Sequence, residues 1–392
     1  MKILFVIPAY IPAWKYGGVA CAMHSLAQEL VLQGADITVY TTDAGLPNSY
    51  DTGQGGACLL DGVKVHYFKH DREAPILSKA LVKKVLETIG NFDLLHLAAV
   101  WQPLSIEVRR AAVKAGCPYI LAPRGSLDAW PVKYKRWKKL LYYMLVERNT
   151  IRMASGISFC SQMELEGSSH FARKGQLLCN IPNGLNFAQW KRNAKGARQW
   201  RAEVGIPEDV FLILSVGRLH YKKGLELAIR ALAPLRERNW HMVLVGNDED
   251  GTGAKLLRQV KDLGIANQVS FFPTVSPLML PAIYSAGDLF ILPSHHENFG
   301  NVVLEAVACE CPVLVSDQVG VAGELAGTKG VAVRKRDVAL WRQALRSAFD
   351  GDDEFKAYPG DRNELERRFS IDTCARNMLS YYQKVISAKN VE

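Results

Sequence analysis

Residues 289–308 read LFILPSHHENFGNVVLEAVA. The apolar run Leu289–Leu292 is followed by a polar loop that contains a proline and a glycine, and then by a helical pattern that begins near Val302. A strand, a loop and a helix in this order form the repeating unit of parallel α/β sheets. Short apolar runs alternate with helical patterns along the whole chain, from Lys2–Ile7 to Val331–Val333. The sequence therefore predicts an α/β protein with parallel sheets.

The series of predicted strands is interrupted once, between Ile181 and Phe211. Pro182-Asn183-Gly184 there has the composition of a turn, and Lys191–Arg201 is polar and basic. We therefore expect two Rossmann-like, doubly wound domains facing a cleft, residues 1–190 and 191–370. The last amphipathic pattern, within residues 371–392, predicts a C-terminal helix that could pack back on the N-terminal domain. Ligands of open α/β sheets bind at the carboxyl ends of the strands, which is where candidate site residues are sought.

Composition excludes several classes of protein. The chain has 392 residues, 48% of them hydrophobic and 22% charged, which is typical of a folded domain and excludes disorder, coiled coil and collagen. Of the net charge of +9, residues 1–190 carry most, with 21 basic and 14 acidic residues, so an anionic partner is favoured. The eight cysteines form no CxxC pair and fit a reducing cytosol better than disulfides or zinc. No apolar run approaches the ~20 residues of a membrane span. We expect a cytoplasmic protein.

The strongest chemical motif is a pair of glutamates, Glu297 and Glu305, spaced eight residues apart. With Glu297 in the loop and Glu305 inside the helix, both carboxylates could reach a ligand that lies over the helix N-terminus. Backbone amides near Gly300, Asn301 and Val302 would point at an anion there. Carboxylates suit sugar and ribose hydroxyls because they accept hydrogen bonds in pairs. The alternative is that Glu297 caps the helix and Glu305 lies on its surface.

Two further motifs follow the first strand of each domain. Arg218 and Lys223 lie beyond Phe211–Val216, and two cations at that edge would neutralise a diphosphate as its charge grows during bond breaking. The alternative is a solvated basic turn. In the N-terminal domain, Gly17 and Gly18 would let the backbone approach a phosphate at a helix N-terminus, or would simply form a turn.

Together these motifs resemble the retaining glycosyltransferases of family four, which have the GT-B fold of two Rossmann-like domains. The resemblance implies that the N-terminal domain binds the acceptor and that the C-terminal domain binds a nucleotide-diphosphate sugar. It implies no cofactor and no metal. It further implies that Arg218 and Lys223 hold the donor diphosphate, that Glu297 contacts the donor sugar and that Glu305 holds the ribose. The remaining residues that we assign to substrate binding are Gly17, Gly18, Arg124, Phe299, Gly300, Asn301 and Val302.

The chain departs from the family pattern after the predicted strand Tyr119–Ala122. Many relatives carry a histidine that positions the reacting sugar, whereas this chain has Arg124-Gly125. This resembles a subgroup that builds bacterial surface polysaccharides, and implies a lipid-linked glycan as acceptor. Arg124 could bind a donor or acceptor phosphate, but the role of the histidine cannot be transferred to it. His96 is more typical of a structural histidine at a strand end than of a base, and both readings stay open.

Residues 131–153 form a basic amphipathic pattern. Between Arg124 and Arg152 there are eight basic and two acidic residues, interleaved with aromatic and aliphatic ones. Such a helix suits an anionic membrane surface, here the inner face of the cell membrane. The alternative is an ordinary helix whose apolar face packs on the sheet.

Three other functions compete with sugar transfer. A sugar-nucleotide epimerase of the same fold would isomerise the donor instead of elongating a glycan. A nucleic-acid-binding protein would use the basic first half, but no recognised binding motif is present, so we expect no nucleic acid as partner. An inactive homologue is disfavoured because Arg218, Lys223, Glu297 and Glu305 are all present.

Overall fold

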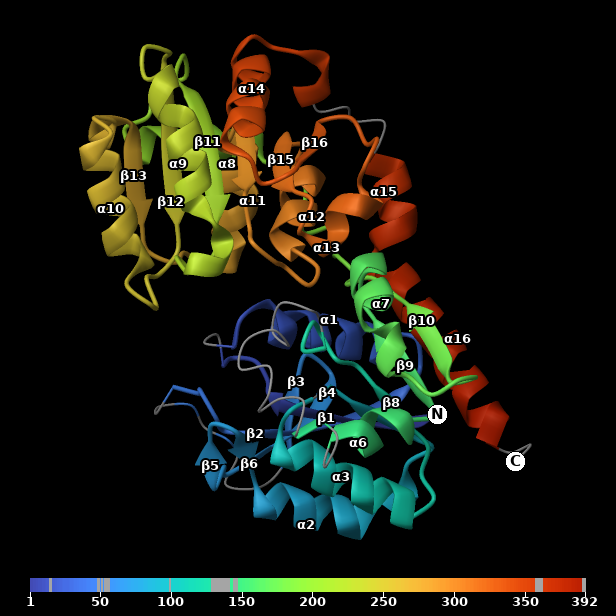
Figure 1. Cartoon of the computed structure of the whole chain (residues 1–392). Helices are drawn as coiled ribbons and strands as arrows, with labels where there is room; N and C mark the ends of the chain where they lie inside the picture. Colours follow the sequence, from blue (N-terminus) through green and yellow to red (C-terminus); the bar gives the residue numbers. More distant parts are fainter. Residues whose placement is uncertain are drawn as a thin grey trace. The chain divides into compact units, whose positions relative to one another are not determined.

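A computed structural model of the chain describes residues 1–13, 16–47, 50, 52, 57–98, 100–127, 142–143, 147–356 and 362–389. The chain divides into two compact units (Figure 1). The first unit is Met1–Gly184 together with Phe369–Glu392, and the second is Leu185–Arg368. The C-terminal segment thus belongs to the same unit as the N-terminus.

The first unit contains an eight-stranded sheet in the order β10-β9-β8-β7-β1-β2-β4-β3. All neighbours are parallel except β3, which runs antiparallel to β4. β5 and β6, which come between β4 and β7 in the sequence, form a separate two-stranded antiparallel sheet. The strands are β1 (Lys2–Ala9), β2 (Asp36–Thr42), β3 (Ala57–Leu60), β4 (Val63–Phe68), β5 (Arg72–Glu73), β6 (Ile76–Leu77), β7 (Leu94–Leu97), β8 (Tyr119–Leu121), β9 (Gly156–Phe159) and β10 (Leu177–Asn180).

Helices cover both faces of this sheet, because successive side chains of a strand point to opposite faces. Ile3, Phe5 and Ile7 of β1 belong to a core cluster with α1 and α16, whereas Leu4 and Val6 belong to one with α2 and α3. Figure 1 shows α2 and α3 together on one side of the sheet. The helices are α1 (Gly18–Leu32), α2 (Lys79–Thr88), α3 (Pro103–Lys114), α6 (Arg148–Arg152), α7 (Gln162–Ser168) and α16 (Ile371–Lys389).

The second unit contains a six-stranded, all-parallel sheet in the order β13-β12-β11-β14-β15-β16. The strands are β11 (Phe211–Val216), β12 (Trp240–Val245), β13 (Val269–Phe272), β14 (Leu289–Leu292), β15 (Val313–Ser316) and β16 (Val331–Arg334). The helices are α8 (Ala194–Glu203), α9 (Leu225–Leu232), α10 (Thr252–Asp262), α11 (Leu280–Ala286), α12 (Asn301–Ala308), α13 (Gly320–Glu324), α14 (Val338–Phe349) and α15 (Arg362–Phe369).

This topology confirms the predicted α/β class with two parallel sheets. In the second unit, β11, β14 and β15 are neighbours, so the loops that follow them leave the sheet side by side at its carboxyl edge. Those loops carry Arg218 and Lys223, then Glu297, and then the segment Asp317–Val319. The fold therefore brings together three stretches that are far apart in the sequence.

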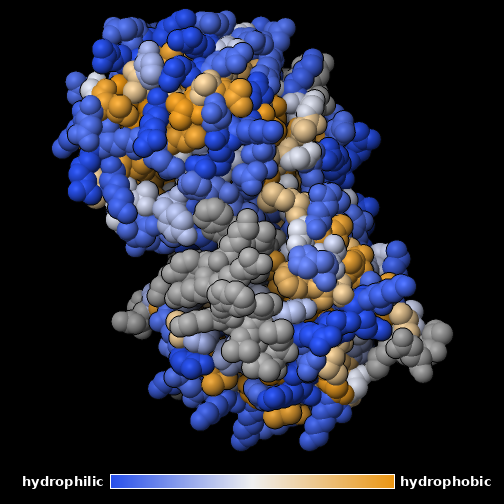
Figure 2. Space-filling model, viewed as in Figure 1, coloured by the Kyte–Doolittle hydropathy of each residue, from blue (hydrophilic) through white to orange (hydrophobic). Residues whose placement is uncertain are grey.

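No helix in the described part of the chain is long and apolar enough to cross a membrane. Hydrophilic side chains predominate on the face that Figure 2 shows, and hydrophobic ones form smaller groups between them. The basic pattern at 131–153 lies largely outside the described residues, so its binding to an anionic surface stays a prediction.

Candidate active site

The centre of the candidate site is an ion pair between the loops that follow β11 and β14. Lys223 ends a short 3-10 helix, Tyr221–Lys223, and its Nζ lies 2.8 Å from Oε1 of Glu297. Both side chains reach solvent, at 17% and 24% exposure. A Cβ added to Gly217, the first residue after β11, would lie 3.5 Å from Nζ of Lys223. The ammonium group therefore lies beside the strand end.

Gly224 lets the two loops approach each other. Its φ of +63° is in the left-handed region, and an added Cβ would lie 2.3 Å from the carbonyl oxygen of Pro293. The amide of His295 also donates to the carbonyl of Lys222 at 2.8 Å. Only glycine fits this conformation and this space, so Gly224 fixes the distance between Lys223 and the Glu297 loop.

Arg336, which follows β16, fastens the same loop to helix α9. Its Nε donates to the carbonyl of Pro293 at 2.9 Å, and its Nη1 lies 2.7 Å from Nδ1 of His295. Its Nη2 is 3.3 Å from Oε1 of Glu226 on α9. The guanidinium thus connects three elements, which restricts the motion of the loop that carries Glu297.

On its other side, the Glu297 loop is joined to the segment after β15. The amide of Glu297 donates to Gln318 at 3.0 Å, and its carbonyl accepts from Gly320 at 2.9 Å. Gly300 precedes helix α12 with a φ of +91°, and an added Cβ would lie 2.5 Å from Cγ1 of Val319. Phe299 is buried at 3% exposure. Asn301 and Val302 form the first turn of α12, where helix amides have no intrahelical acceptor.

Glu305 lies one turn further along α12 and is partly buried. The hydroxyl of Tyr284 on α11, a fully buried side chain, donates to its Oε2 at 2.9 Å. Burial raises the pKa of Glu305 to about 7, while the Tyr284 hydroxyl and the charge of Lys223 oppose that rise. Lys223 therefore acts on both glutamates, one by direct contact and one through its field.

Arg218 does not join this cluster directly. Its Nη1 lies 2.8 Å from Oε2 of Glu249, in the loop after β12, and its side chain is 47% exposed. The predicted pairing of Arg218 with Lys223 on one diphosphate stays a prediction. Lys223, Glu297 and Glu305 are the predicted residues that the structure brings together.

The other predicted residues lie in the first unit. Gly17 precedes helix α1 with a φ of +74°, and Gly18 is the first residue of that helix. Arg124 follows β8 and donates from Nη1 to Oδ1 of Asn183 at 2.6 Å. His96 is fully buried, and burial followed by the charge of Arg124 holds its pKa well below the ordinary value. A neutral, buried imidazole fits the structural reading of His96 better than that of a base.

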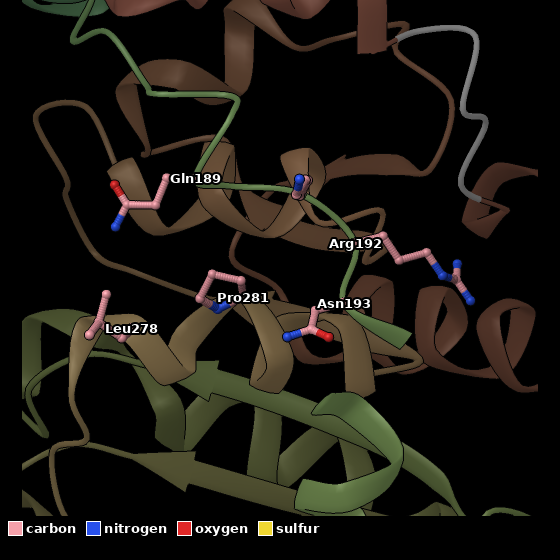
Figure 3. Close-up of a pocket in the computed structure, with 6 residues that line it drawn as sticks. Gln189, Arg192, Asn193, Leu278 and Pro281 are labelled. Carbon is pink, nitrogen blue, oxygen red and sulfur yellow. The ribbon is translucent and has the colours of Figure 1, made fainter. Parts of the chain in front are cut away.

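A separate pocket of about 440 Å³ lies in the second unit, between residues 189–193 and helix α11 (Figure 3). It is lined by Gln189, Lys191, Arg192, Asn193, Leu278 and Pro281. In Figure 3 the side chain of Arg192 extends away from Leu278 and Pro281, and its Nη1 is 3.3 Å from Oε2 of Glu310. None of the predicted site residues lines this pocket, and no carboxylate does. The candidate site is instead the open sheet edge around Lys223.

Sequence reasoning missed the residues that hold the site in place, Tyr284, Arg336, His295, Glu226 and Glu249. Arg336 has a weak signal, because it comes three residues after the last predicted strand of the sheet, Val331–Val333. Tyr284 has none, because it precedes Glu305 by 21 residues within an ordinary helical pattern.

Comparison with known proteins identifies the family. Residues 17–184 match the model of the glycosyl transferase 4-like domain, and residues 197–364 match that of glycosyl transferases group 1. HepE of Anabaena, solved in complex with UDP and glucose, superposes with a TM-score of 0.78 at 20% identity, over 98% of this chain and 99% of that one. The chain has the GT-B fold, with a glycosyl transferase 4-like domain followed by a glycosyl transferases group 1 domain.

Two other known proteins are similar to this chain. WaaG, a glycosyltransferase involved in lipopolysaccharide biosynthesis, has a TM-score of 0.66 at 19% identity, over 99% of each chain. The D-inositol 3-phosphate glycosyltransferase of Gordonia bronchialis is 33% identical over 198 residues, which are 48% of this chain and 43% of that protein. The match spans about half the length of the curated relatives of that name.

Proposed function

We propose that the chain is a retaining glycosyltransferase that moves a sugar from a nucleotide-diphosphate sugar to a sugar hydroxyl, without a metal ion. The observation that carries this proposal is the Lys223–Glu297 pair at the carboxyl edge of the second sheet, with Glu305 one helix turn away. One cation between two acids, next to a helix N-terminus, suits a ligand that combines an anionic diphosphate with hydroxyl groups.

Each residue of the site has a separate role in the proposed reaction. The bond between C1 of the sugar and the diphosphate oxygen breaks, and Lys223 neutralises the charge that grows on that oxygen. Arg218 is the second cation for the diphosphate. The acceptor oxygen bonds to C1 on the same face, and its proton passes to the released diphosphate. Glu297 accepts hydrogen bonds from the donor sugar, and Glu305 accepts them from the ribose.

The donor and acceptor classes are supported by the relatives. HepE binds UDP-glucose in its solved structure, WaaG takes part in lipopolysaccharide biosynthesis, and the Gordonia enzyme is named for a phosphorylated polyol. We therefore assign a nucleotide sugar to the second unit and a lipid-linked surface-polysaccharide intermediate to the first. An acceptor of this kind would be met at the inner face of the cell membrane.

The assay incubates the full chain with UDP-, GDP- and ADP-sugars, first alone and then with a glycan acceptor. A bound donor raises the melting temperature by mass action. We expect release of a nucleoside diphosphate and an elongated glycan with the anomeric configuration of the donor, at the same rate in EDTA. An isomerised donor without transfer would identify an epimerase. A product with the opposite anomeric configuration would contradict the retaining assignment. Loss of activity in EDTA would contradict the metal-independent assignment.

The pKa of Glu305 predicts how donor binding depends on pH. Ribose hydroxyls donate to the ionised carboxylate of Glu305, whose pKa is about 7. The affinity for the nucleotide should therefore be high above pH 7 and low below it. Tyr284→Phe removes a donor to that carboxylate, which raises the pKa of Glu305 and moves the rise in affinity to higher pH. At pH 7 we expect roughly tenfold weaker binding of the nucleoside diphosphate in a calorimetric titration.

Tyr40→Phe is the matched control for this prediction. Tyr40 is a buried tyrosine of the first unit whose hydroxyl lies 3.1 Å from Oγ1 of Thr88. Removal of the Tyr40 hydroxyl should leave the pH dependence of nucleoside diphosphate binding unchanged. An unshifted profile in Tyr284→Phe would mean that Glu305 does not contact the nucleotide.

A further inference from the structure

The turn after β8 holds Arg124 in a backbone conformation that does not favour arginine. Arg124 has a φ of +52° and Gly125 one of +80°. The fully buried carboxylate of Glu164 fixes the turn, since it accepts from the amides of Gly125 at 2.5 Å and of Cys160 at 2.9 Å. Glycine or asparagine adopts the left-handed region at lower cost than arginine. The turn alone therefore does not explain why a long cation occupies this position.

Among the described residues, the hydrogen-bond partners of the Arg124 guanidinium are neutral. Nη1 donates to Oδ1 of Asn183 at 2.6 Å, and Nη2 lies 2.9 Å from Sδ of Met23, which is a weak acceptor. Its Nε is buried and has no hydrogen-bond partner within the described part of the chain. Arg124 is only partly buried, and no anionic side chain in the described part of the chain pairs with it.

Two further buried groups near Arg124, His96 and Tyr382, are both neutral. His96 and Tyr382 are fully buried, and the Tyr382 hydroxyl lies 2.6 Å from Nδ1 of His96. Burial and the charge of Arg124 keep that imidazole neutral, because they hold its pKa well below the ordinary value. Burial also keeps the Tyr382 hydroxyl protonated, since it raises the pKa of that group far above the ordinary value. His96 and Tyr382 therefore do not balance the positive charge of Arg124, and the carboxylate of Glu164 bonds to the backbone amides of Gly125 and Cys160.

Arg124 lies where ligands of α/β sheets bind. It follows the carboxyl end of β8, and Asn183 follows that of β10 by three residues, so both belong to the same edge of the sheet. We propose that Arg124, positioned by Asn183 and by the Glu164-held turn, binds an oxyanion carried by the acceptor. The proposal rests on the proposed function, which assigns the acceptor to this unit. A guanidinium binds phosphate or carboxylate through two parallel hydrogen bonds, which fits a phosphorylated or acidic sugar.

Calorimetric titration of the full chain tests this proposal. Saturating UDP first fills the donor site, and inorganic phosphate or glucuronate is then titrated. We expect saturable binding of one of them, and which one it is distinguishes a phosphorylated from an acidic acceptor. Arg124→Asn, which suits the left-handed turn, should weaken that binding at least tenfold. Arg124→Lys keeps the positive charge but lacks the planar guanidinium, so its affinity should lie between those of the wild type and Arg124→Asn.

The matched control is Arg110→Gln, which removes an exposed charge of the same unit that pairs with Glu107. It should bind the oxyanion like the wild type. Equal affinity in Arg124→Asn and wild type, or no saturable binding by the wild type, would overturn the proposal. UDP binding, measured first in every variant, reports separately on the proposed function. If Arg124→Asn does not fold, wild-type crystals soaked in tungstate provide a second test. Tungstate bound at Arg124 would support the proposal, and crystals without tungstate at Arg124 would overturn it.

Discussion

Lys223→Met should lower turnover of the nucleotide sugar by about two to three orders of magnitude without unfolding the protein. The Lys223 ammonium lies 2.8 Å from Glu297, and its charge also opposes the rise in the pKa of Glu305. Without it, two carboxylates face the donor and no cation at this position neutralises the departing diphosphate. The measurement is the initial rate of nucleoside diphosphate release at saturating donor, together with the melting temperature.

Lys222→Met is the control for this experiment, because it removes the same charge one residue earlier. The Lys222 side chain takes no part in the pair with Glu297, and we expect a rate within twofold of the wild type. A similar loss in both variants would point to the general field of the basic turn instead of to Lys223. A wild-type rate in Lys223→Met would remove this residue from the reaction.

Glu297→Gln should lower turnover by about a hundredfold or more at an almost unchanged melting temperature. The amide keeps the shape of the side chain but loses the charge that pairs with Lys223 and the acceptor strength needed by the sugar hydroxyls. The loop itself should persist, since its backbone bonds to Gln318 and Gly320 and its contacts with Arg336 do not involve the carboxylate. Stopped assays of product formation and thermal unfolding measure the two effects.

Glu237→Gln is the matched control, because that carboxylate is 90% exposed and pairs only loosely with Arg236 at 3.4 Å. It should retain full activity. If Glu297→Gln worked at the wild-type rate, Glu297 would not contact the donor sugar. If it lost activity only because it unfolded, the lower melting temperature would reveal that cause.

The central strands of the second sheet could be predicted because they are almost completely buried. Leu289–Leu292 and Phe211–Val216 were expected as strands and have these same bounds in β14 and β11. Each is a short apolar run that ends at turn or polar residues, so the pattern is unambiguous. The edge strand β3, Ala57–Leu60, was not predicted, because it lies half-exposed in an antiparallel pair and has no such run.

Helix α8 was missed for a different reason. The segment Lys191–Arg201 was interpreted as a polar stretch between domains, yet Ala194–Glu203 is helical and Trp200 and Arg201 are buried. Arg201 is buried because its Nη2 pairs with Asp288 at 2.6 Å, a contact between residues 87 positions apart. The N-cap signal at Asn193, whose side chain accepts from the amide of Gly196, was the local sign of this helix.

The candidate site could likewise be predicted only in part. The grouping of Lys223, Glu297 and Glu305 could be expected, since each motif follows a predicted strand and parallel strands end at one edge. Their supports could not be expected, because Tyr284, Arg336 and Glu226 act through contacts that only the folded chain creates. The pairing of Arg218 with Glu249 likewise depends on the loop after β12.

A crystal structure of the full chain with UDP would show whether Lys223 and Glu305 bind the nucleotide. We expect a β-phosphate oxygen within hydrogen-bond distance of Nζ of Lys223, a ribose hydroxyl on the carboxylate of Glu305, and phosphate oxygens near the amides of Asn301 and Val302. A nucleotide bound elsewhere on the chain, or at this edge without contact to Lys223 and Glu305, would contradict this expectation.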